Sequence, residues 1–266
     1  YLPPTALYML LDEPSRSSRD TSSLKILILV GSPVSPTRLA EAVEAFGPSL
    51  CQAYGQVESP MIMTWLSPEQ TAEAATDPSR RHRLASCGRP SHAARLAIMD
   101  DEGRLLANGE VGEIVSRGPL VSHSYYRMAE ATAQARQFNW HHTGDLGYRD
   151  DDGFFYIVDR KKDMVITGGF NVFTAEVEAA VTELPQVREC AVIGLPHETW
   201  GEQVYACVVA EGISGDQVIA HVKQRLGGVK APKAVEFVAS LPRTPAGKLD
   251  KKTLRAERWK GERNVN

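Results

Sequence analysis

The sequence lacks several features that would assign it quickly to a class. None of its apolar runs approaches the roughly 20 residues that a bilayer-spanning helix needs, so we expect no membrane span. Its formal net charge is only −3, which gives no electrostatic case for binding nucleic acid or an acidic membrane surface. It also contains no GxGxxG, GxSxG or HExxH motif, so a dinucleotide-binding loop, a nucleophile elbow and a zinc-protease helix have no support.

Cysteine is scarce, and its spacing predicts neither a disulfide framework nor a metal site. No two of the four cysteines form a CxxC pair; they are Cys51, Cys87, Cys190 and Cys207. His141-His142 has no metal-ligand spacing with any of them, so zinc is not expected. Buried reduced thiols are typical of an intracellular protein, and we expect a cytoplasmic one. The chain opens at Tyr1 without a charged signal-peptide region, which predicts a processed product or a fragment of something longer.

The first part of the chain carries an α/β pattern. Leu24–Val30 is a continuous apolar run, which is typical of a strand buried on both faces. A helix expected over Thr37–Phe46 and a strand over Leu50–Tyr54 complete a βαβ-like unit. Ligands bind at the carboxyl ends of such strands. We therefore expect Gly31-Ser32-Pro33 and Tyr54-Gly55 to lie on one rim.

The middle of the chain reads as hairpin-rich β structure, and the last part as α/β again. Asp145–Tyr148 and Phe154–Val158 flank an Asp-Asp-Gly turn, which predicts a hairpin. The other expected elements are helices over 5–11, 129–137, 174–182 and 214–226, a short helix after 242, and strands over 95–99, 112–116, 187–193, 204–209 and 234–238. The expected fold is α/β plus β, with a βαβ unit and a small β-barrel or sheet ending a large domain, followed by a small mobile α+β domain. We place the large domain at 1–161 (an α/β part at 1–80, a barrel part at 81–161) and the small one at 162–266, because apolar periodicity stops near Lys162.

Two acidic positions in the first domain have both a functional and a structural interpretation. The ring of Tyr54 could lie on a planar base, Gly55 would let a ligand approach the backbone, and Glu58 could hold a divalent cation beside phosphates. Taken alone, that segment fits a solvated surface turn better. The carboxylate of Asp145 could accept two hydroxyl hydrogens from a ribose, or it could cap its own turn, and its sequence favours neither.

Three later segments also allow both a functional and a structural interpretation. Arg160-Lys161-Lys162-Asp163 could place an arginine near a ribose or phosphate, or be a solvated charged loop. Gly168-Gly169 could let the backbone pass close to a narrow channel, although a plain turn before the next helix explains it as well. Pro242 to Lys248 is not a phosphate loop, because Leu249 follows the Gly-Lys pair; it predicts an exposed arm that carries one lysine.

The segments carry more information together than separately. In chain order they are Tyr54-Gly55-x-x-Glu58, Gly112-Glu113-Ile114 with Arg117-Gly118-Pro119, Thr143-Gly144-Asp145, Asp159-Arg160-Lys161-Lys162-Asp163, Gly168-Gly169-Phe170-Asn171 with Glu176-Val177-Glu178, and Pro242 to Gly247-Lys248. This ordered set resembles the adenylate-forming superfamily, and within it the AMP-dependent acyl-CoA synthetases that act on fatty or aryl acids. The resemblance covers essentially the whole chain.

The resemblance implies a two-step ligase that uses ATP, Mg²⁺, CoA and a small carboxylic acid. The acid attacks the α-phosphate of ATP to give acyl-AMP and pyrophosphate, and the thiol of CoA then displaces AMP. The implied catalytic residues are Lys248 and the magnesium ligand Glu58. The implied nucleotide-binding residues are Gly31, Ser32, Pro33, Ala53, Tyr54, Gly55, Asp145 and Arg160. Lys162 matches the hinge, and Gly168, Gly169 and Phe170 would face the pantetheine of CoA.

The chain departs from the family pattern in three places. The Ser/Thr/Gly-rich phosphate loop is absent, so we expect an N-terminal remainder upstream of Tyr1 and no adenylation by this chain alone. Val57 replaces a threonine whose hydroxyl contacts phosphate in relatives, which predicts lower activity or an unusual subgroup. Thr174 replaces a proline, and its hydroxyl is expected to cap the following helix.

The acceptor and the activity itself have alternatives. The parent protein could be an adenylating module that loads a carrier-protein thiol, and the absence of a carrier domain before Asn266 mildly favours CoA. It could also be a catalytically degenerate relative that only binds nucleotide. No nucleic-acid partner is expected, and a homo-oligomer is possible.

Overall fold

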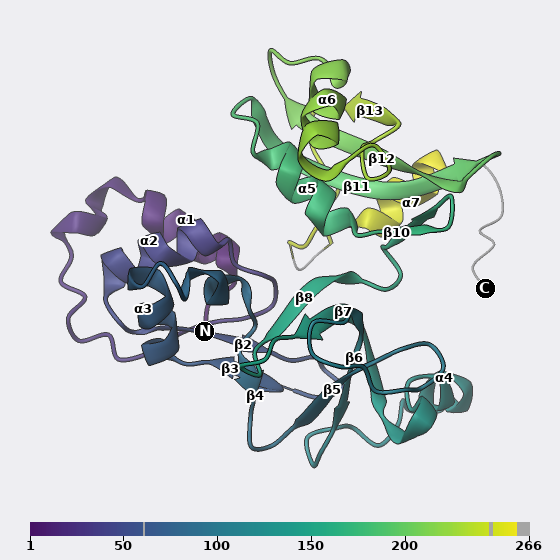
Figure 1. Ribbon diagram of the computed structural model, residues 1–266. Helices are drawn as coiled ribbons and strands as arrows, with labels where there is room; N and C mark the ends of the chain where they lie inside the picture. The colour runs from purple at the N-terminus through teal and green to yellow at the C-terminus, as the bar shows by residue number, and fades with distance from the viewer. Residues whose placement is uncertain (61, 245–246, 260–266) are drawn as a thin grey trace. The chain divides into compact units, whose positions relative to one another are not determined.

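The computed structural model describes residues 1–60, 62–244 and 247–259, and it divides into two compact units (Figure 1). The first unit is Tyr1–Ile157 and the second is Val158–Asn266. The domain boundary expected at Lys162 lies a few residues after this division. The two units are described separately.

The first unit begins with a four-stranded sheet. Its elements are α1 (Pro4–Asp12), η1 (Pro14–Ser18), β1 (Leu27–Leu29), α2 (Pro36–Phe46), β2 (Leu50–Tyr54), β3 (Thr64–Leu66), α3 (Pro68–Thr76), η2 (Arg81–Ala85) and β4 (Arg89–Pro90). The strand order is β1-β2-β3-β4, and β1 and β2 are parallel with α2 between them in the chain. This confirms the expected βαβ unit. Leu7 of α1, Leu39 of α2 and Leu50 of β2 are fully buried in one core, and the helices lie against this sheet (Figure 1).

The rest of the first unit forms a second sheet. Its elements are β5 (Arg95–Met99), β6 (Gly112–Arg117), α4 (Ala129–Gln134), η3 (Gln137–Asn139), β7 (His141–Arg149) and β8 (Phe155–Arg160), in the strand order β5-β6-β7-β8. Of the small barrel or sheet expected here, the described residues form an open sheet and not a barrel. A barrel with a filled interior takes about eight strands, and this sheet has four. Ile98, Ile114 and Phe155 bury the inner face.

The second unit is an α+β sandwich around one sheet. Its elements are β9 (Val165–Thr167), β10 (Phe170–Val172), α5 (Thr174–Thr182), β11 (Val187–His197), β12 (Gly201–Ala210), α6 (Gly215–Leu226), β13 (Ala234–Phe237) and α7 (Lys251–Arg258). The order is β10-β9-β12-β11, and β13 also pairs with β12, so that β11 is an edge strand. The long ladder of β11 with β12 runs from Val187↔Ala210 to His197↔Gly201.

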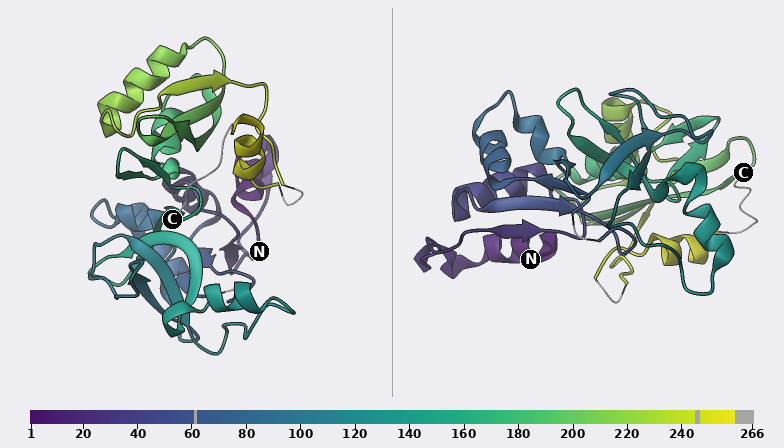
Figure 2. Two further views of the ribbon diagram at one scale, coloured as in Figure 1. Left: turned by 90° about the vertical axis from the view of Figure 1, so that its right-hand side faces the viewer. Right: turned by 90° about the horizontal axis from the view of Figure 1, so that it is seen from below.

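The two faces of this sheet are covered by different helices, because side chains alternate along each strand. Val192 of β11 belongs to a core shared with α5 and α6. Its neighbours Ala191 and Ile193 point the other way and pack with Leu254 of α7. Helix α7 thus lies on the face of the sheet opposite α5 and α6 (Figures 1 and 2).

The described part of the chain contains neither a membrane-spanning helix nor a disulfide. No helix there is both long and apolar enough to cross a membrane. No disulfide joins the cysteines; Cys51 and Cys207 are buried, and Cys87 and Cys190 are partly buried.

Candidate functional site

The ends of β1 and β2 form a rim in the first unit. The parallel register pairs Leu29 with Gln52, so both strands end at the same edge of the sheet. Gly31, Ser32 and Pro33 follow β1 there and are exposed, while Tyr54 ends β2. The predicted shared rim is therefore present. Gly31 has φ +94° and no heavy atom near the position of a Cβ, so its surface is open.

Asp145 lies close to this rim, although 91 residues separate it from Tyr54. The Tyr54 hydroxyl donates to Asp145 Oδ2 at 2.6 Å, and Gln56 Nε2 donates to the same oxygen at 2.9 Å. Asp145 is only 6% exposed. Burial, with Asp145 beside it, raises the pKa of Tyr54 well above its usual value, so the phenol keeps its proton as a donor. Two motifs that the sequence quoted separately thus form one cradle.

Asp145 lies within β7, and other groups hold this part of the strand. Glu113 Oε1 accepts from the Gly144 amide at 2.9 Å, and Gly144 has φ +71°. The Thr143 hydroxyl donates to the Ile114 carbonyl at 2.6 Å and accepts from the Asp145 amide at 3.2 Å. The Asp145 amide is thus satisfied by the Thr143 hydroxyl and not by an aspartate side chain. The Asp145 carboxylate is directed to Tyr54 and Gln56 instead.

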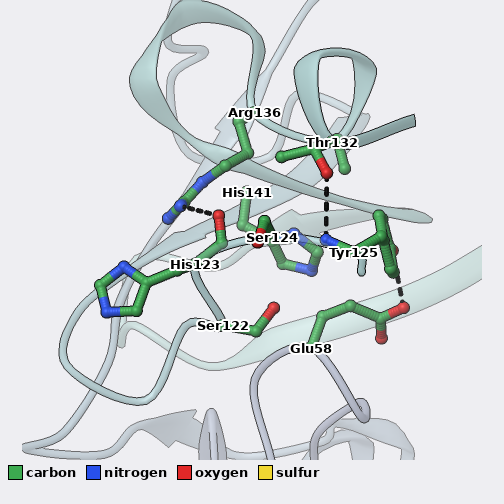
Figure 3. Close-up of a pocket in the computed structure, with 9 residues that line it drawn as sticks. Glu58, Ser122, His123, Ser124, Tyr125, Thr132, Arg136 and His141 are labelled. Atoms are coloured by element: carbon green, nitrogen blue, oxygen red, sulfur yellow. Dashed lines mark hydrogen bonds between the residues drawn. The ribbon is translucent and has the colours of Figure 1, made fainter. Parts of the chain in front are cut away.

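Glu58 lines a small hollow beside α4 (Figure 3). The Tyr125 hydroxyl donates to Glu58 Oε1 at 2.7 Å, and this bond is the main cause that lowers the pKa of Glu58. The Ser122 amide donates to the Glu58 carbonyl at 2.7 Å, which ties the two loops together. The hollow is lined by Glu58, Ser122, His123, Ser124, Tyr125, Thr132, Ala135, Arg136 and His141.

The surroundings of Glu58 fit a Mg²⁺ ion that is bound by one protein carboxylate together with water and substrate phosphates. They do not fit a metal ion bound by protein side chains alone. Mg²⁺ commonly takes one or two carboxylates and completes its shell with water and substrate phosphates. Glu58 supplies one ionised carboxylate. Within 1–60, 62–244 and 247–259, no group of three or more His, Cys, Asp or Glu side chains could hold a metal by itself.

The second unit contains the charged turn and the glycine pair. Residues Arg160, Lys161 and Lys162 are exposed, and the Asp163 amide donates to the Arg160 carbonyl at 2.9 Å to close the turn. Gly168 and Gly169 have φ of +57° and +82° and join β9 to β10. They form the two-residue hairpin turn that such dihedrals favour; a turn was expected here as one alternative, but the two strands on either side of it were not. Phe170 follows them and is 61% exposed.

Lys248 stands on a loop that is closed at its base. The Thr244 amide donates to the Lys248 carbonyl at 2.7 Å, and the Asp250 amide donates to the Pro242 carbonyl at 2.9 Å. Arg243 pairs with Leu249 in an isolated bridge, and its guanidinium contacts Glu189 at 2.8 Å. Lys248 itself is exposed, as expected. Pro245 and Ala246, part of the expected arm, lie outside the described residues.

The expected helix cap at Thr174 was wrong. Phe173 is the N-cap of α5 and makes no side-chain cap bond, while Thr174 occupies the first helical position. Both the amide and the hydroxyl of Thr174 donate to Asp159 Oδ2, the hydroxyl at 2.8 Å. Asp159 thus satisfies the helix end, because a carboxylate accepts an orphan amide better than the threonine's own hydroxyl does here.

Sequence reasoning assigned no role to several supporting residues. Gln56 and Glu113 lie inside motifs that the sequence analysis quoted, and Glu113 stands out as a buried acid on an apolar strand. Tyr125 carries no such signal, because only folding brings it to Glu58.

Comparison with known families and proteins gives a consistent result. Residues 1–126 match the family described as AMP-binding enzyme, and residues 176–248 match the AMP-binding enzyme C-terminal domain. The chain is 46% identical over 270 residues to the medium/long-chain-fatty-acid–CoA ligase FadD8 of Mycobacterium tuberculosis, a match that covers 98% of this chain and 46% of that protein.

Solved structures show the same likeness. The amide bond synthetase McbA from Marinactinospora thermotolerans superposes with a TM-score of 0.85 at 38% identity, over 96% of this chain and 52% of McbA. ATP-bound MatB from Rhodopseudomonas palustris gives a TM-score of 0.85 at 33% identity, over 96% and 50%. The chain spans about half the length of the relatives it matches. The two family matches follow one another along the chain, at 1–126 and 176–248, and the chain belongs to the AMP-binding enzyme family.

Proposed function

We propose that this chain is part of an AMP-forming acid–thiol ligase, which activates a carboxylic acid with ATP and passes the acyl group to CoA. The observation that carries the proposal is the cradle around Asp145, where a buried carboxylate is oriented by Tyr54 and Gln56 next to the β1–β2 rim. A buried acid held by two donors is a preorganised acceptor, and a ribose diol offers the matching hydroxyl donors. The names of the CoA ligase FadD8 and of ATP-bound MatB support the same assignment.

In the first unit, the rim and cradle would bind the nucleotide. The backbone at Gly31-Ser32-Pro33, Ala53 and Gly55 would border the adenine, with the Tyr54 ring against it. Asp145 would accept the ribose hydroxyls. Glu58 would be the protein ligand of a Mg²⁺ ion that neutralises phosphate charge when bound.

In the second unit, Lys248 would serve the first chemical step. A carboxylate oxygen of the acid bonds to the α-phosphorus and pyrophosphate leaves, so negative charge builds on the phosphoryl oxygens. The ammonium of Lys248 would bridge the incoming carboxylate and the α-phosphate. One preorganised donor of this kind contributes about 3–4 kcal/mol. Arg160 would contact the ribose or a phosphate.

The second step would use another face of the same unit. The thiol sulfur of CoA bonds to the acyl carbon and loses its proton to solvent, and AMP leaves with the bonding electron pair. Lys162 would be the hinge for the movement between steps, and Gly168, Gly169 and Phe170 would face the pantetheine. We take CoA as the acceptor and a medium- or long-chain fatty acid as the first acid to try, because FadD8 is named for both.

Pyrophosphate release tests the proposal directly. The assay uses ATP, Mg²⁺ and a panel of fatty and aryl acids, first with the 266-residue chain and then with a longer protein that adds the upstream half of a relative's length. We expect turnover from the longer protein alone, because the triphosphate loop of the family is absent from this chain. Robust turnover by the chain itself would refute that part of the proposal.

A binding measurement separates the enzyme from a nucleotide-binding relative without activity. Calorimetry with AMP and Mg²⁺ on the longer protein should show binding in both cases. Only the enzyme should also release pyrophosphate, and only a CoA ligase should then give a CoA thioester rather than load a carrier-protein thiol. Absence of AMP binding would contradict the nucleotide assignment altogether.

A further inference from the structure

A buried polar network lies along the edge strand β11 and joins helices on opposite faces of the second unit. Helix α5 packs on one face of the sheet, and α7 packs on the other. Neither the family resemblance nor the proposed chemistry assigns a catalytic or binding role to the side chains that connect them. They are Asp159, Thr174, Glu178 and Lys251.

Lys251 is the centre of this network. Its ammonium lies 2.7 Å from Glu178 Oε1 and donates to the Thr174 hydroxyl oxygen at 2.7 Å. Thr174 in turn donates to Asp159, as described above. The side chain of Lys251 is 12% exposed, and Thr174 is fully buried. A charge in this position is held by specific partners, because an unpaired buried charge is costly.

Glu178 attaches the network to the sheet. Its Oε1 also accepts from the Val192 amide at 2.7 Å, on the open edge of β11. Burial raises the pKa of Glu178, while Lys251 and the Val192 amide act against that rise. Lys251 therefore closes a link from α7, across the edge of the sheet, to α5.

A second contact reinforces the first, one helical turn away. Arg255 stands four residues after Lys251 and therefore on the same side of α7. Its guanidinium contacts Asp163 Oδ1 at 3.1 Å, and both side chains are mostly buried. Asp159 and Asp163 are the two ends of the charged turn that contains Lys162. Both ends of that turn are thus connected to α7, one through Thr174 and the other directly.

Helix α7 also follows the Lys248 loop without a linker. Lys251 is the first residue of α7, and Asp250 both caps the helix and closes the base of the loop. We propose that Lys251, supported by Arg255, is a positioning residue that fixes the Lys248 loop relative to the charged turn, so that both move as one piece. This inference rests on the proposed function for its effect on catalysis.

The catalytic test separates the two half-reactions in the longer protein. The variants are Lys251→Met, the conservative Lys251→Arg, and Lys252→Met as a matched control at the exposed neighbouring position. We expect Lys251→Met to slow single-turnover pyrophosphate release by about tenfold to a hundredfold, as a misplacement of about 1 Å does. Thioester formation from supplied acyl-AMP should change little, Lys251→Arg should recover most of the loss, and Lys252→Met should behave as wild type. Equal losses in both half-reactions, or no loss in either, would overturn the positioning role.

A second measurement does not depend on enzyme activity. Amide hydrogen exchange on the 266-residue chain should be faster at Gly247 to Asp250 in Lys251→Met but not in Lys252→Met. Thr174→Val removes the hydroxyl from the other side of the link and should give the same local increase. Unchanged exchange in both variants would overturn the link, even if the wild-type protein adenylates as proposed. Faster exchange in a protein that never adenylates would keep the link and refute the function.

Discussion

The acid of the first unit and the lysine of the second unit are presented in opposite ways. Asp145 is 6% exposed, and its carboxylate is held by Tyr54 at the end of β2 and by Gln56 just after it. Lys248 is exposed, and main-chain bonds around Thr244 and Asp250 hold its loop. The first arrangement fixes a functional group, whereas the second fixes only the point from which a flexible side chain extends.

This difference matches what each residue is proposed to do. A group that binds the same ligand atoms throughout a reaction gains from being rigid, since little ordering remains to be done when the ligand arrives. A group that is needed in only one of two chemical steps gains from lying on a segment that can move as a rigid body. The comparison therefore predicts that changes at Lys248 act on one chemical step, and changes around Asp145 act on nucleotide binding in general.

The largest effect should come from Lys248→Ala in the longer protein. Loss of one preorganised cation, about 3–4 kcal/mol, should slow adenylation by about a hundredfold to a thousandfold. Thioester formation from supplied acyl-AMP should be spared. Rapid-quench measurement of acyl-AMP and of thioester decides this, and equal loss in both steps would remove the distinction between the two residues.

Asp145→Asn should weaken AMP binding by about tenfold or more, since bonds to a charged acceptor contribute about 1.5–3 kcal/mol each. Calorimetry with AMP measures the effect. Asp151→Asn is the matched control. Asp151 is exposed on the hairpin turn after β7, and its carboxylate accepts a hydrogen bond from the Asn108 side chain at 3.1 Å. If the two variants bind AMP equally well, the cradle has no role in nucleotide recognition.

A smaller effect is expected in the pH dependence of stability. Burial raises the pKa of Glu178 above its ordinary value of 4.5, against the influence of Lys251 and the Val192 amide, while the nearby Asp159 acts with burial. The folded chain then keeps a proton that the unfolded chain has already lost, so this group's contribution to the free energy of unfolding falls as pH rises above 4.5. Glu178→Gln cannot titrate. Urea unfolding of both proteins across this window should show wild type losing stability relative to Glu178→Gln, and a difference that rises with pH would contradict the raised pKa.

The smallest effect should come from Gly169→Ala. Gly169 has φ +82° and no heavy atom near its Cβ position, so the substitution tests backbone strain alone, about 1–2 kcal/mol. Gly228→Ala is the control, since it has no left-handed φ and its nearest neighbour would be the Lys223 side chain at 3.8 Å. Thermal unfolding compares them. If the chain tolerates Gly169→Ala as well as the control, the hairpin turn needs no glycine there.

Several helices and strands of the fold could be predicted from the sequence. The strand Leu50–Tyr54 and the helix Thr174–Thr182 have the expected bounds, and α2 begins one residue early at Pro36. The hairpin of β9 and β10 was missed, because three residues per strand are too few to show a period. Helix α3 was missed too, although Ser67 and Gln70 form a capping box that the sequence displays.

The site was predictable as a set of motifs but not as an arrangement. The resemblance named Tyr54 and Asp145 without showing that the phenol donates to the carboxylate. The partners of Lys251 could not be predicted from the sequence. Thr174 lies 77 residues earlier, and contact over that separation depends on how α5 and α7 pack on either side of one strand. Thr174 was misassigned for the same reason: Asp159 reaches its amide only after β8 passes the start of α5.

The closed base of the Lys248 loop has a consequence for how this segment can vary. The bond from Asp250 to the Pro242 carbonyl and the bond from Thr244 to the Lys248 carbonyl each require a set number of residues between their ends. One inserted or deleted residue would rotate the lysine away from its direction while the sheet and α7 remain intact. Chain length between Pro242 and Asp250 is therefore constrained more strictly than a surface loop usually is, and loop exchange with a relative should succeed only between segments of equal length.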